Sequence, residues 1–265
     1  MVHYPGGGTL AARCTELEAR VRPPIVLWAV PRSVSTAFER VMRARGDLIV
    51  FSEPFSVPYY LGQERASDRF GAAGPHASTE EWTSVVQELV AATEAGTVFV
   101  KDMAYHVTPC LDRELVGNFQ NTFIVRHPGH TLGSLKRLLP DFTPEEAGFE
   151  QQYRLMRLAL EASDEEPVIL DGEELRRSGA TVVEDYCRRV GLPFLPESLT
   201  WQAGLLADWM RWERWHGDVA ESTGIRPPGG DPEPARPEGV DPDVYARCVE
   251  CYEKMMELGR VARGN

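Results

Sequence analysis

An apolar run that ends abruptly in a hydroxyl-rich loop constrains the fold of this chain more than any other feature. Residues Pro24–Val30 are almost wholly apolar, and the loop over 31–36 reads Pro-Arg-Ser-Val-Ser-Thr. Beyond the loop, Phe38, Val41 and Met42 are spaced for one buried face of a helix. The pattern predicts a buried strand, a polar loop and a helix N-terminus, in that order.

Such a loop is suited to binding an anion. Backbone N–H groups at a helix N-terminus and the positive end of the helix dipole both favour negative charge. Ser33, Ser35 and Thr36 add hydroxyl donors, and Arg32 adds a planar cation that matches a phosphate or a sulfate group. The alternative interpretation is an ordinary Ser/Thr cap of a helix that follows a buried strand.

A second loop of the same kind follows the apolar run Asn121–Val125. Arg126 stands at the end of this run, and Ser134 lies eight residues later on the first turns of a predicted helix. The carboxyl ends of parallel strands lie at one edge of a sheet, so we expect the two loops to face the same ligand.

At these residues the chain resembles the family of sulfotransferases that depend on PAPS (3′-phosphoadenosine 5′-phosphosulfate). That family has a Pro-[Lys/Arg]-Ser-Gly-[Ser/Thr]-Thr loop for the 5′-phosphosulfate and an Arg-x-Pro…Ser segment for the 3′-phosphate. The chain has the corresponding residues at Pro31–Thr36 and at Arg126, Pro128 and Ser134, with about ninety residues between the motifs. The resemblance implies PAPS as the sulfuryl donor and no metal. The cofactor-binding residues that it implies in the two loops are Arg32, Ser33, Val34, Ser35, Thr36, Ala37, Arg126 and Ser134.

The chain departs from the family pattern in three places. Val34 replaces the loop glycine, so we expect the backbone to approach the cofactor less closely there. Arg32 stands where many members have lysine, which keeps the charge and changes its geometry. Residues Val168–Leu175 are similar to the family's strand and following segment but lack its tyrosine.

The family often closes its cofactor site with a basic, glycine-containing loop near the C-terminus. Ser222, Thr223 and Arg226 are the residues that we expect in this role. The tryptophans between Trp201 and Trp215 have near-helical spacing, which is typical of core aromatic residues.

The predicted reaction is transfer of the sulfuryl group of PAPS to a hydroxyl or amine of a small-molecule acceptor, with a secondary metabolite as one candidate. Sulfation could also prepare a leaving group for a later elimination or cyclisation. The alternatives are a kinase-like phosphotransferase on the same scaffold and a module that binds PAP, the product that PAPS leaves after sulfuryl transfer, without turnover. The Walker A pattern and an evident acidic pair for Mg²⁺ are both absent from the sequence, which disfavours the phosphotransferase.

Sulfuryl transfer requires cations over the transferred group and a base for the acceptor. Arg32 is the first predicted cation, and Lys101, at the end of the strand predicted over 97–101, is the second. The alternative for Lys101 is an ion pair with Asp102. Glu53 is the predicted base, because it directly follows the second strand and apolar neighbours would partly desolvate it. His106 is the rival base, since imidazole titrates in the right range.

The order of elements predicts an α/β fold, a P-loop-like parallel sheet with helices on both faces. Strands are expected at Ile25–Val30, Leu48–Phe51, Thr97–Lys101, Thr122–Val125 and Pro167–Leu170. Helices are expected at Ser35–Arg45, Thr79–Ala95, Leu111–Val116, Thr131–Leu138, Pro144–Glu161 and Thr181–Val190. The chain is predicted to form a single domain (1–265) with an N-terminal extension (1–22), a mobile Pro/Gly-rich loop (226–243) and a C-terminal helix (244–261). Gly71–Ser78 is expected to be a loop, and Phe55–Arg69 an irregular, aromatic wall for the acceptor.

Composition restricts the partners. A net charge of −12 argues against nucleic acid, and no apolar run is long enough to span a membrane. Five scattered cysteines and no signal peptide predict reduced thiols in the cytoplasm, and the lone pair Cys248 and Cys251 disfavours zinc. Acidic, aromatic loops predict an acceptor of apolar or cationic character. The oligomeric state stays open, with a homodimer among the alternatives.

Overall fold

The computed structural model describes residues 22–71, 81–163, 167–229 and 234–261. The predicted N-terminal extension, the loop over 72–78, the first residues of the helix predicted at 79–95 and the middle of the loop over 226–243 lie outside these ranges.

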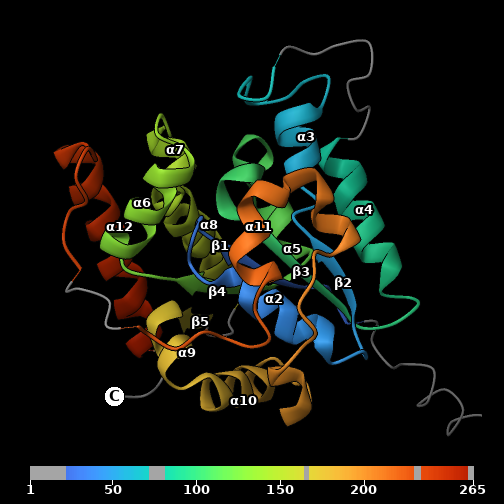
Figure 1. The fold of residues 1–265 in the computed structure, drawn as a ribbon. Helices are drawn as coiled ribbons and strands as arrows, with labels where there is room; N and C mark the ends of the chain where they lie inside the picture. The colour runs from blue at the N-terminus through green and yellow to red at the C-terminus, as the bar shows by residue number, and fades with distance from the viewer. Residues whose placement is uncertain (1–21, 72–80, 164–166, 230–233, 262–265) are drawn as a thin grey trace, which may run out of the picture.

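A sheet of five parallel strands forms the centre of the molecule (Figure 1). Its strands lie in the order β2-β3-β1-β4-β5. Their bounds are Ile25–Ala29 (β1), Ile49–Ser52 (β2), Val98–Met103 (β3), Gln120–Val125 (β4) and Val168–Asp171 (β5). All five predicted strands are present, and the predicted fold class, an α/β parallel sheet with helices on both faces, is confirmed.

Strand β1 is buried on both faces, which explains its continuous apolar run. Val26 and Trp28 belong to one core cluster, whereas Ile25 and Leu27 belong to the other, as the period of two along a strand requires. The first cluster is covered by α4 (Trp82–Ala92), α5 (Arg113–Gly117), α6 (Pro128–Leu138), α8 (Phe149–Ala162) and α12 (Pro242–Val261). The second is covered by α2 (Ser35–Ala44), α3 (Ser56–Leu61), α9 (Gly172–Arg177) and α10 (Gly179–Arg189).

Two helix predictions and one prediction of irregular structure were wrong in detail. The helix predicted over 144–161 is two helices, α7 (Pro144–Ala147) and α8, because Gly148 between them takes a φ of 81°. Helix α6 begins at Pro128 rather than at residue 131, because His127 caps it by accepting a hydrogen bond from the Gly129 backbone N–H. The segment 55–69, predicted to be irregular, contains α3.

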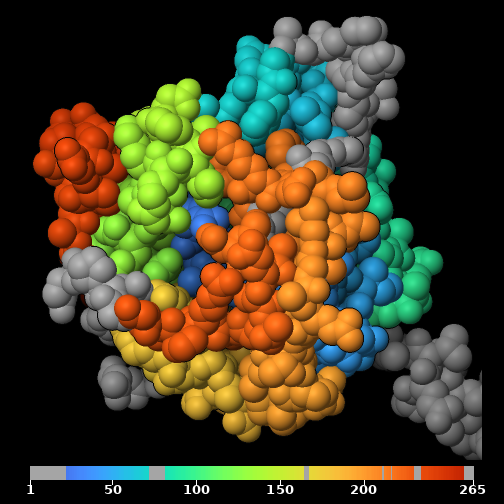
Figure 2. Space-filling view, viewed as in Figure 1, coloured from blue at the N-terminus to red at the C-terminus, as the bar shows by residue number. Residues whose placement is uncertain are grey.

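The segment after the short helix η2 (Pro196–Leu199) crosses the carboxyl edge of the sheet. It contains η3 (Ala207–Trp212) and α11 (Glu213–Ala220), so the spacing of its tryptophans does not reflect one long helix. Figure 2 shows this orange segment lying across the face of the molecule, with blue atoms of the N-terminal part visible in a hollow beside it. The segment therefore covers the loops that the sequence analysis singled out.

Further along, residues 234–240 pack on α6. A Cβ atom at Gly129 would lie 2.8 Å from the Ala235 carbonyl oxygen, and Val240 is buried.

Among the described residues, no helix is long and apolar enough to cross a membrane. Cys110, Cys187, Cys248 and Cys251 are free thiols.

Candidate active site

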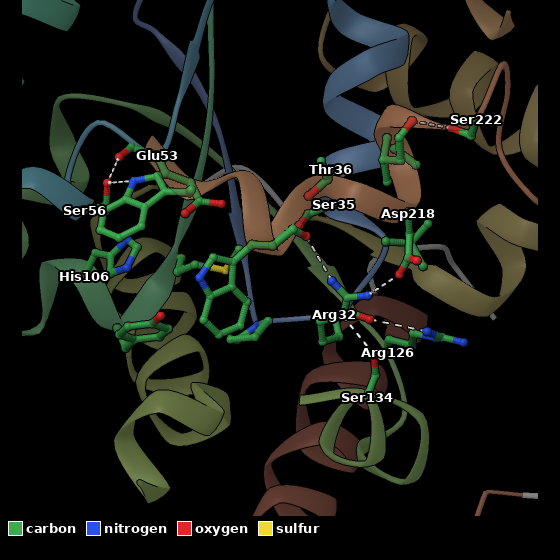
Figure 3. Close-up of a pocket in the computed structure, with 18 of the residues that line it drawn as sticks. Arg32, Ser35, Thr36, Glu53, Ser56, His106, Arg126, Ser134, Asp218 and Ser222 are labelled. Carbon is green, nitrogen blue, oxygen red and sulfur yellow. Dashed lines mark hydrogen bonds and ion pairs between the residues drawn. The ribbon is translucent and has the colours of Figure 1, made fainter. Parts of the chain in front are cut away.

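A pocket lies at the carboxyl edge of β1, β3 and β4, beneath α11 (Figure 3). Two loops meet there, one between β1 and α2 and the other between β4 and α6, as predicted. Of the predicted site residues, those that line the pocket are Arg32, Val34, Ser35, Thr36, Ala37, Glu53, His106, Arg126, Ser134, Ser222 and Arg226.

The loop between β1 and α2 has a strained backbone. Arg32 and Val34 take φ values of 67° and 75°, the left-handed region that side chains rarely adopt. Val34 therefore takes a backbone conformation that favours glycine, although it is β-branched. Ser33 faces inward: it is fully buried, and its hydroxyl donates to the Val30 carbonyl oxygen at 2.7 Å. The Ser33 hydroxyl is therefore buried and already donates within the protein, and this position does not support its predicted role as a side-chain donor to the ligand.

Arg32 joins both loops and α11. Its Nε donates to Ser134 Oγ at 2.9 Å, and its Nη1 donates to the Trp215 carbonyl oxygen at 3.1 Å. Its Nη2 donates to Asp218 Oδ2 at 2.8 Å. The predicted cation and the predicted serine are thus in direct contact, although they lie in loops far apart in the sequence.

Arg126 lies beside Arg32. Its Nη1 donates to the Arg32 carbonyl oxygen at 3.4 Å, and its Nε donates to Glu173 Oε1 at 2.5 Å. Glu173 also lies 3.6 Å from Arg176, a pocket residue that the sequence analysis did not identify. Arg176 in turn donates to the carbonyl oxygens of Arg226 and Pro227. These contacts place Arg32, Arg126, Arg176 and Arg226 together on one side of the pocket.

The C-terminal residues predicted to close the site are divided. Ser222 and Arg226 line the pocket, but Thr223 does not. The backbone carbonyl of Thr223 accepts from Trp201 N, next to a bridge between Thr200 and Gly224. Thr223 therefore holds the segment in place instead of facing the ligand.

Lys101 is buried beneath the pocket and does not line it. Strand β3 continues to Met103, so Lys101 lies inside the strand and not at its end. Its Nζ donates to Glu53 Oε1 and lies 3.6 Å from Glu39 Oε2. Burial alone would lower the pKa of Lys101, but the two carboxylates outweigh it and raise the pKa. Lys101 therefore carries a positive charge that holds Glu53, and its predicted contact with the transferred group is not supported by this position.

Glu53 lines the pocket although the strand that it follows, β2, is not next to β1. Strand β3 lies between β1 and β2, so Glu53 is two strands away from the first loop. Its φ of 49° is left-handed, and its backbone N–H donates to the Lys101 carbonyl oxygen. This turn directs the chain from β2 into α3 at the rim of the pocket.

His106 and Asp102 form a buried pair four residues apart. His106 Nδ1 bonds to Asp102 Oδ1 at 2.6 Å, and Asp102 also accepts from the backbone N–H groups of Phe55 and Met103. Burial raises the pKa of Asp102, while the hydrogen bonds from His106 and the Phe55 backbone oppose that rise. The other ring nitrogen, Nε2, is buried and has no partner among the described residues, and His106 lines the pocket. A carboxylate that accepts from Nδ1 leaves Nε2 as a proton acceptor.

Aromatic rings line the pocket next to His106. Tyr60, Phe70 and Trp212 lie in mutual contact, with ring centroids 4.8 to 5.8 Å apart. The predicted aromatic wall at 55–69 thus includes Tyr60 and extends to Phe70 and Trp212. Of the tryptophans expected in the core, Trp209 is fully buried, whereas Trp212 and Trp215 line the pocket.

Together these groups provide what transfer of an anionic group requires. Arginines and two helix N-termini on one side can bind negative charge, and a carboxylate-oriented imidazole on the other can take a proton. Among the described residues, no group of three or more His, Cys, Asp or Glu side chains is arranged to hold a metal ion.

Comparison with known proteins assigns the family. Residues 24–257 match the family described as "Sulfotransferase domain". Two Arabidopsis thaliana proteins, branched-chain-amino-acid aminotransferase-like proteins 2 and 1, are each 24% identical over 76% of this chain. The chain spans about a third (36%) of the length of these curated relatives.

The fold has a counterpart among solved structures. The sulfotransferase domain of the Synechococcus PCC 7002 olefin synthase superposes with a TM-score of 0.50 at 15% identity, over 89% of this chain and 95% of that one. That likeness concerns the fold, and the sequence match over residues 24–257 carries the assignment. The chain therefore belongs to the sulfotransferase family.

Proposed function

We propose that the chain transfers the sulfuryl group of PAPS to a hydroxyl group of a small-molecule acceptor. The observation that carries this proposal is the contact of Arg32 with Ser134 and of Arg126 with the Arg32 carbonyl. Through these contacts, two loops that each follow a parallel strand form one anion-binding surface.

The residues present fit such a donor. Arg32, Ser35 and Thr36, with the N-terminus of α2, are suited to the phosphosulfate end, because they combine a planar cation, two hydroxyls and a helix dipole. Arg126, Ser134 and Arg226 are suited to a separate phosphate group. When bound, PAPS would supply the activated sulfuryl group.

His106 is the base that the geometry favours. Its Nε2 would take the acceptor hydroxyl proton while the acceptor oxygen forms its bond to sulfur and the bond from sulfur to the donor phosphate breaks. Asp102 holds the ring orientation and stabilises the imidazolium that forms. Glu53, the base predicted from the sequence, is engaged by Lys101 from below, which favours a role in shaping and charging the pocket.

The first experiment measures calorimetric binding of PAP and of ATP, each with EDTA present. Tight PAP binding without metal, together with sulfuryl transfer from labelled PAPS to an acceptor panel, supports the proposal. Tighter ATP binding, or a requirement for Mg²⁺, would favour the phosphotransferase instead. PAP binding with no transfer to any acceptor would favour a binding module.

Two matched arginine variants connect this binding to the pocket. Arg126→Ala should weaken PAP binding by at least tenfold, because a charged hydrogen-bond donor is lost. Arg154→Ala, an exposed arginine on α8 outside the pocket, should leave the PAP dissociation constant unchanged. Equal effects of the two variants would place PAP elsewhere on the protein.

A further inference from the structure

The two sides of the pocket carry opposite chemistry. The contacts described above gather Arg32, Arg126, Arg176 and Arg226 on one side of the pocket, which we call the donor side. Figure 3 shows Glu53, Ser56 and His106 on the other side, away from Arg32 and Arg126. We call this second side the acceptor half, and define it by its lining residues: Glu53, Ser56, Tyr60, Phe70, His106 and Trp212. Among the described residues that line the pocket, the only lysines or arginines are the four arginines of the donor side; Arg69, directly before Phe70, lies outside the lining and pairs with Glu146.

An aromatic wall begins directly beside the candidate base. The Tyr60 ring lies 5.4 Å from the His106 ring, 4.8 Å from Phe70 and 5.8 Å from Trp212, measured between centroids. Phe70 is 45% exposed, so the wall ends at the mouth of the pocket. Aromatic rings attract cations by their negative faces, with tryptophan the most effective.

The polar atoms of the wall bond to neighbouring side chains. The Tyr60 and Tyr105 hydroxyls lie 3.0 Å apart, and Trp212 Nε1 donates to Ser56 Oγ at 3.2 Å. The wall is therefore poorly suited to the many hydroxyls of a sugar, which require convergent donors and acceptors. What it offers a ligand is mainly aromatic surface next to the Glu53 carboxylate.

Two carboxylates, Glu53 and Glu146, act on the tyrosines of the acceptor half. Burial raises the pKa of Tyr105, and the charges of Glu53 and Glu146 raise it further. Burial and the same two carboxylates also raise the pKa of Tyr60, whereas the hydrogen bond to Tyr105 and the charge of Arg69, which pairs with Glu146, oppose that rise. Lys101, the nearest cation from below, is shared between Glu53 and Glu39. A positive charge would thus be stabilised here, and a carboxylate would be repelled.

We infer that the acceptor is an alcohol that carries an ammonium group. Its hydroxyl would lie at His106 Nε2, and its ammonium group would lie between the aromatic wall and Glu53. This inference rests on the proposed function, since it concerns the acceptor of the same transfer. It explains why every arginine lining the pocket in the described part of the chain lies on the donor side.

The test uses three small phenols that differ in charge but share the ring and the hydroxyl: tyramine, 4-propylphenol and 4-hydroxyphenylacetate. Their dissociation constants are measured on the PAP-loaded protein, by calorimetry or by the tryptophan fluorescence of the pocket. We expect tyramine to bind at least tenfold more tightly than both others. Equal binding of the three, tighter binding of the neutral or anionic phenol, or no measurable binding of any would overturn the inference.

Variants locate the preference. Phe70→Leu and Glu53→Gln should each reduce the tyramine preference severalfold, because one removes a ring and the other a charge. Glu53→Gln also leaves the buried Lys101 with less compensation and could lower the melting temperature, so Phe70→Leu provides the test that does not depend on Lys101. Met210→Ala, which truncates a 70% exposed side chain of the same segment as Trp212 outside the pocket, is the control and should change nothing. An unchanged preference in Phe70→Leu contradicts the site.

The outcomes separate this inference from the proposed function. Failure of the proposed function appears as no PAP binding by the unmodified protein, or as PAP binding without sulfuryl transfer from PAPS to any acceptor. Failure of the inference alone appears as PAP binding and sulfuryl transfer without a preference for the cationic phenol.

Discussion

His106 and Glu53 compete for one role at the same pocket, and variants can separate them. His106→Ala removes Nε2, which has no partner among the described residues, and should lower kcat by about 10²–10⁴-fold, the usual contribution of a general base. PAP affinity should stay near normal, because His106 lies on the side away from the arginines. Sulfuryl transfer and PAP binding are measured on the same preparation.

Glu53→Gln is the matched comparison. It should retain more transfer activity than His106→Ala, since Glu53 is already engaged by Lys101. A Glu53→Gln protein that loses transfer completely, beside an active His106→Ala protein, would restore Glu53 as the base that the sequence predicted.

Gly172 stands before Glu173, where the family resemblance leads one to expect a tyrosine, and the structure explains the difference. A Cβ atom at Gly172 would lie 2.7 Å from the Ser33 carbonyl oxygen and 3.2 Å from Arg126 Cβ. Gly172→Ala should therefore displace the loop between β1 and α2, lower the free energy of unfolding by about 1–3 kcal/mol and weaken PAP binding. Denaturant unfolding and calorimetry measure the two effects.

Gly217→Ala is the control for this change. No atom of the described residues lies within 4 Å of a Cβ atom at Gly217, which is in α11. Alanine there should be neutral or raise stability by up to about 1 kcal/mol, because it favours the helix. Equal losses in both variants would contradict the steric argument at Gly172.

The sequence identified the residues of the two loops because each follows an apolar strand, where a local pattern is sufficient. It did not identify Arg176 or Asp102, because their importance depends on contacts between distant segments. A signal was nevertheless present: Asp102 and His106 are four residues apart, and Arg176 follows the fifth strand at the same sheet edge. Lys101 was misassigned because its burial depends on Glu39 and Glu53, which come from other elements.

At the scale of elements, α11 covers the donor side of the pocket and contributes an anion of its own. Asp218 accepts a hydrogen bond from Arg32 Nη2, so its carboxylate engages an N–H group that an anionic ligand would otherwise use. Asp218→Asn should therefore tighten PAP binding. The side chain of Asp218 is 73% exposed, which limits the gain to about 1 kcal/mol, or roughly fivefold. The PAP dissociation constant is compared at low and high salt, and the gain should shrink as salt rises.

Glu213→Gln makes the same change of charge on the same helix. Glu213 is exposed and does not line the pocket, so this variant should reproduce only the general effect of one fewer negative charge. If the two variants tighten PAP binding equally, the Arg32–Asp218 contact has no specific role.

The strands were predictable because apolar runs bounded by turn residues report burial directly. The segment over 201–220 was not, because its tryptophans serve two environments, the core and the lining of the pocket. Trp209 is buried and donates to Glu39, Trp212 donates to Ser56, and Trp215 lines the pocket. Regular spacing of aromatic residues predicted the core, but part of this segment folds over the pocket, so the spacing did not show which tryptophans are buried.

For the whole molecule, alternation of strands and helices predicted the fold class, but no local pattern gave the strand order. The placement of β3 between β1 and β2 arises from packing across the sheet, and it brings Lys101 beneath Glu53. The cytoplasmic location remains a prediction, and a homodimer remains one of the alternatives for the oligomeric state.

The interior of the protein should make it sensitive to alkali. Burial raises the pKa of Tyr60, Tyr105 and Tyr186 above the ordinary value of 10.0, and carboxylates raise that of Lys101 above 10.5 in spite of burial. A group whose pKa is raised in the folded state contributes stability that is complete below the unfolded pKa and is lost as the pH rises through the folded value. All four groups act in the same direction, so the free energy of unfolding should fall as the pH rises above about 10, by up to about 1.4 kcal/mol per pH unit for each group.

Urea unfolding at pH 8 to 11.5 measures this slope, and Tyr186→Phe tests its origin. The variant loses the hydrogen bond between the Tyr186 and Thr122 hydroxyls, which costs about 1 kcal/mol at neutral pH. Above pH 10 its stability should fall less steeply than that of the unmodified protein, by the contribution of one proton, because phenylalanine has no group to ionise in the unfolded state. Parallel slopes for the two proteins, or constant stability up to pH 11, would mean that these buried hydroxyls ionise as readily in the folded chain as in the unfolded one.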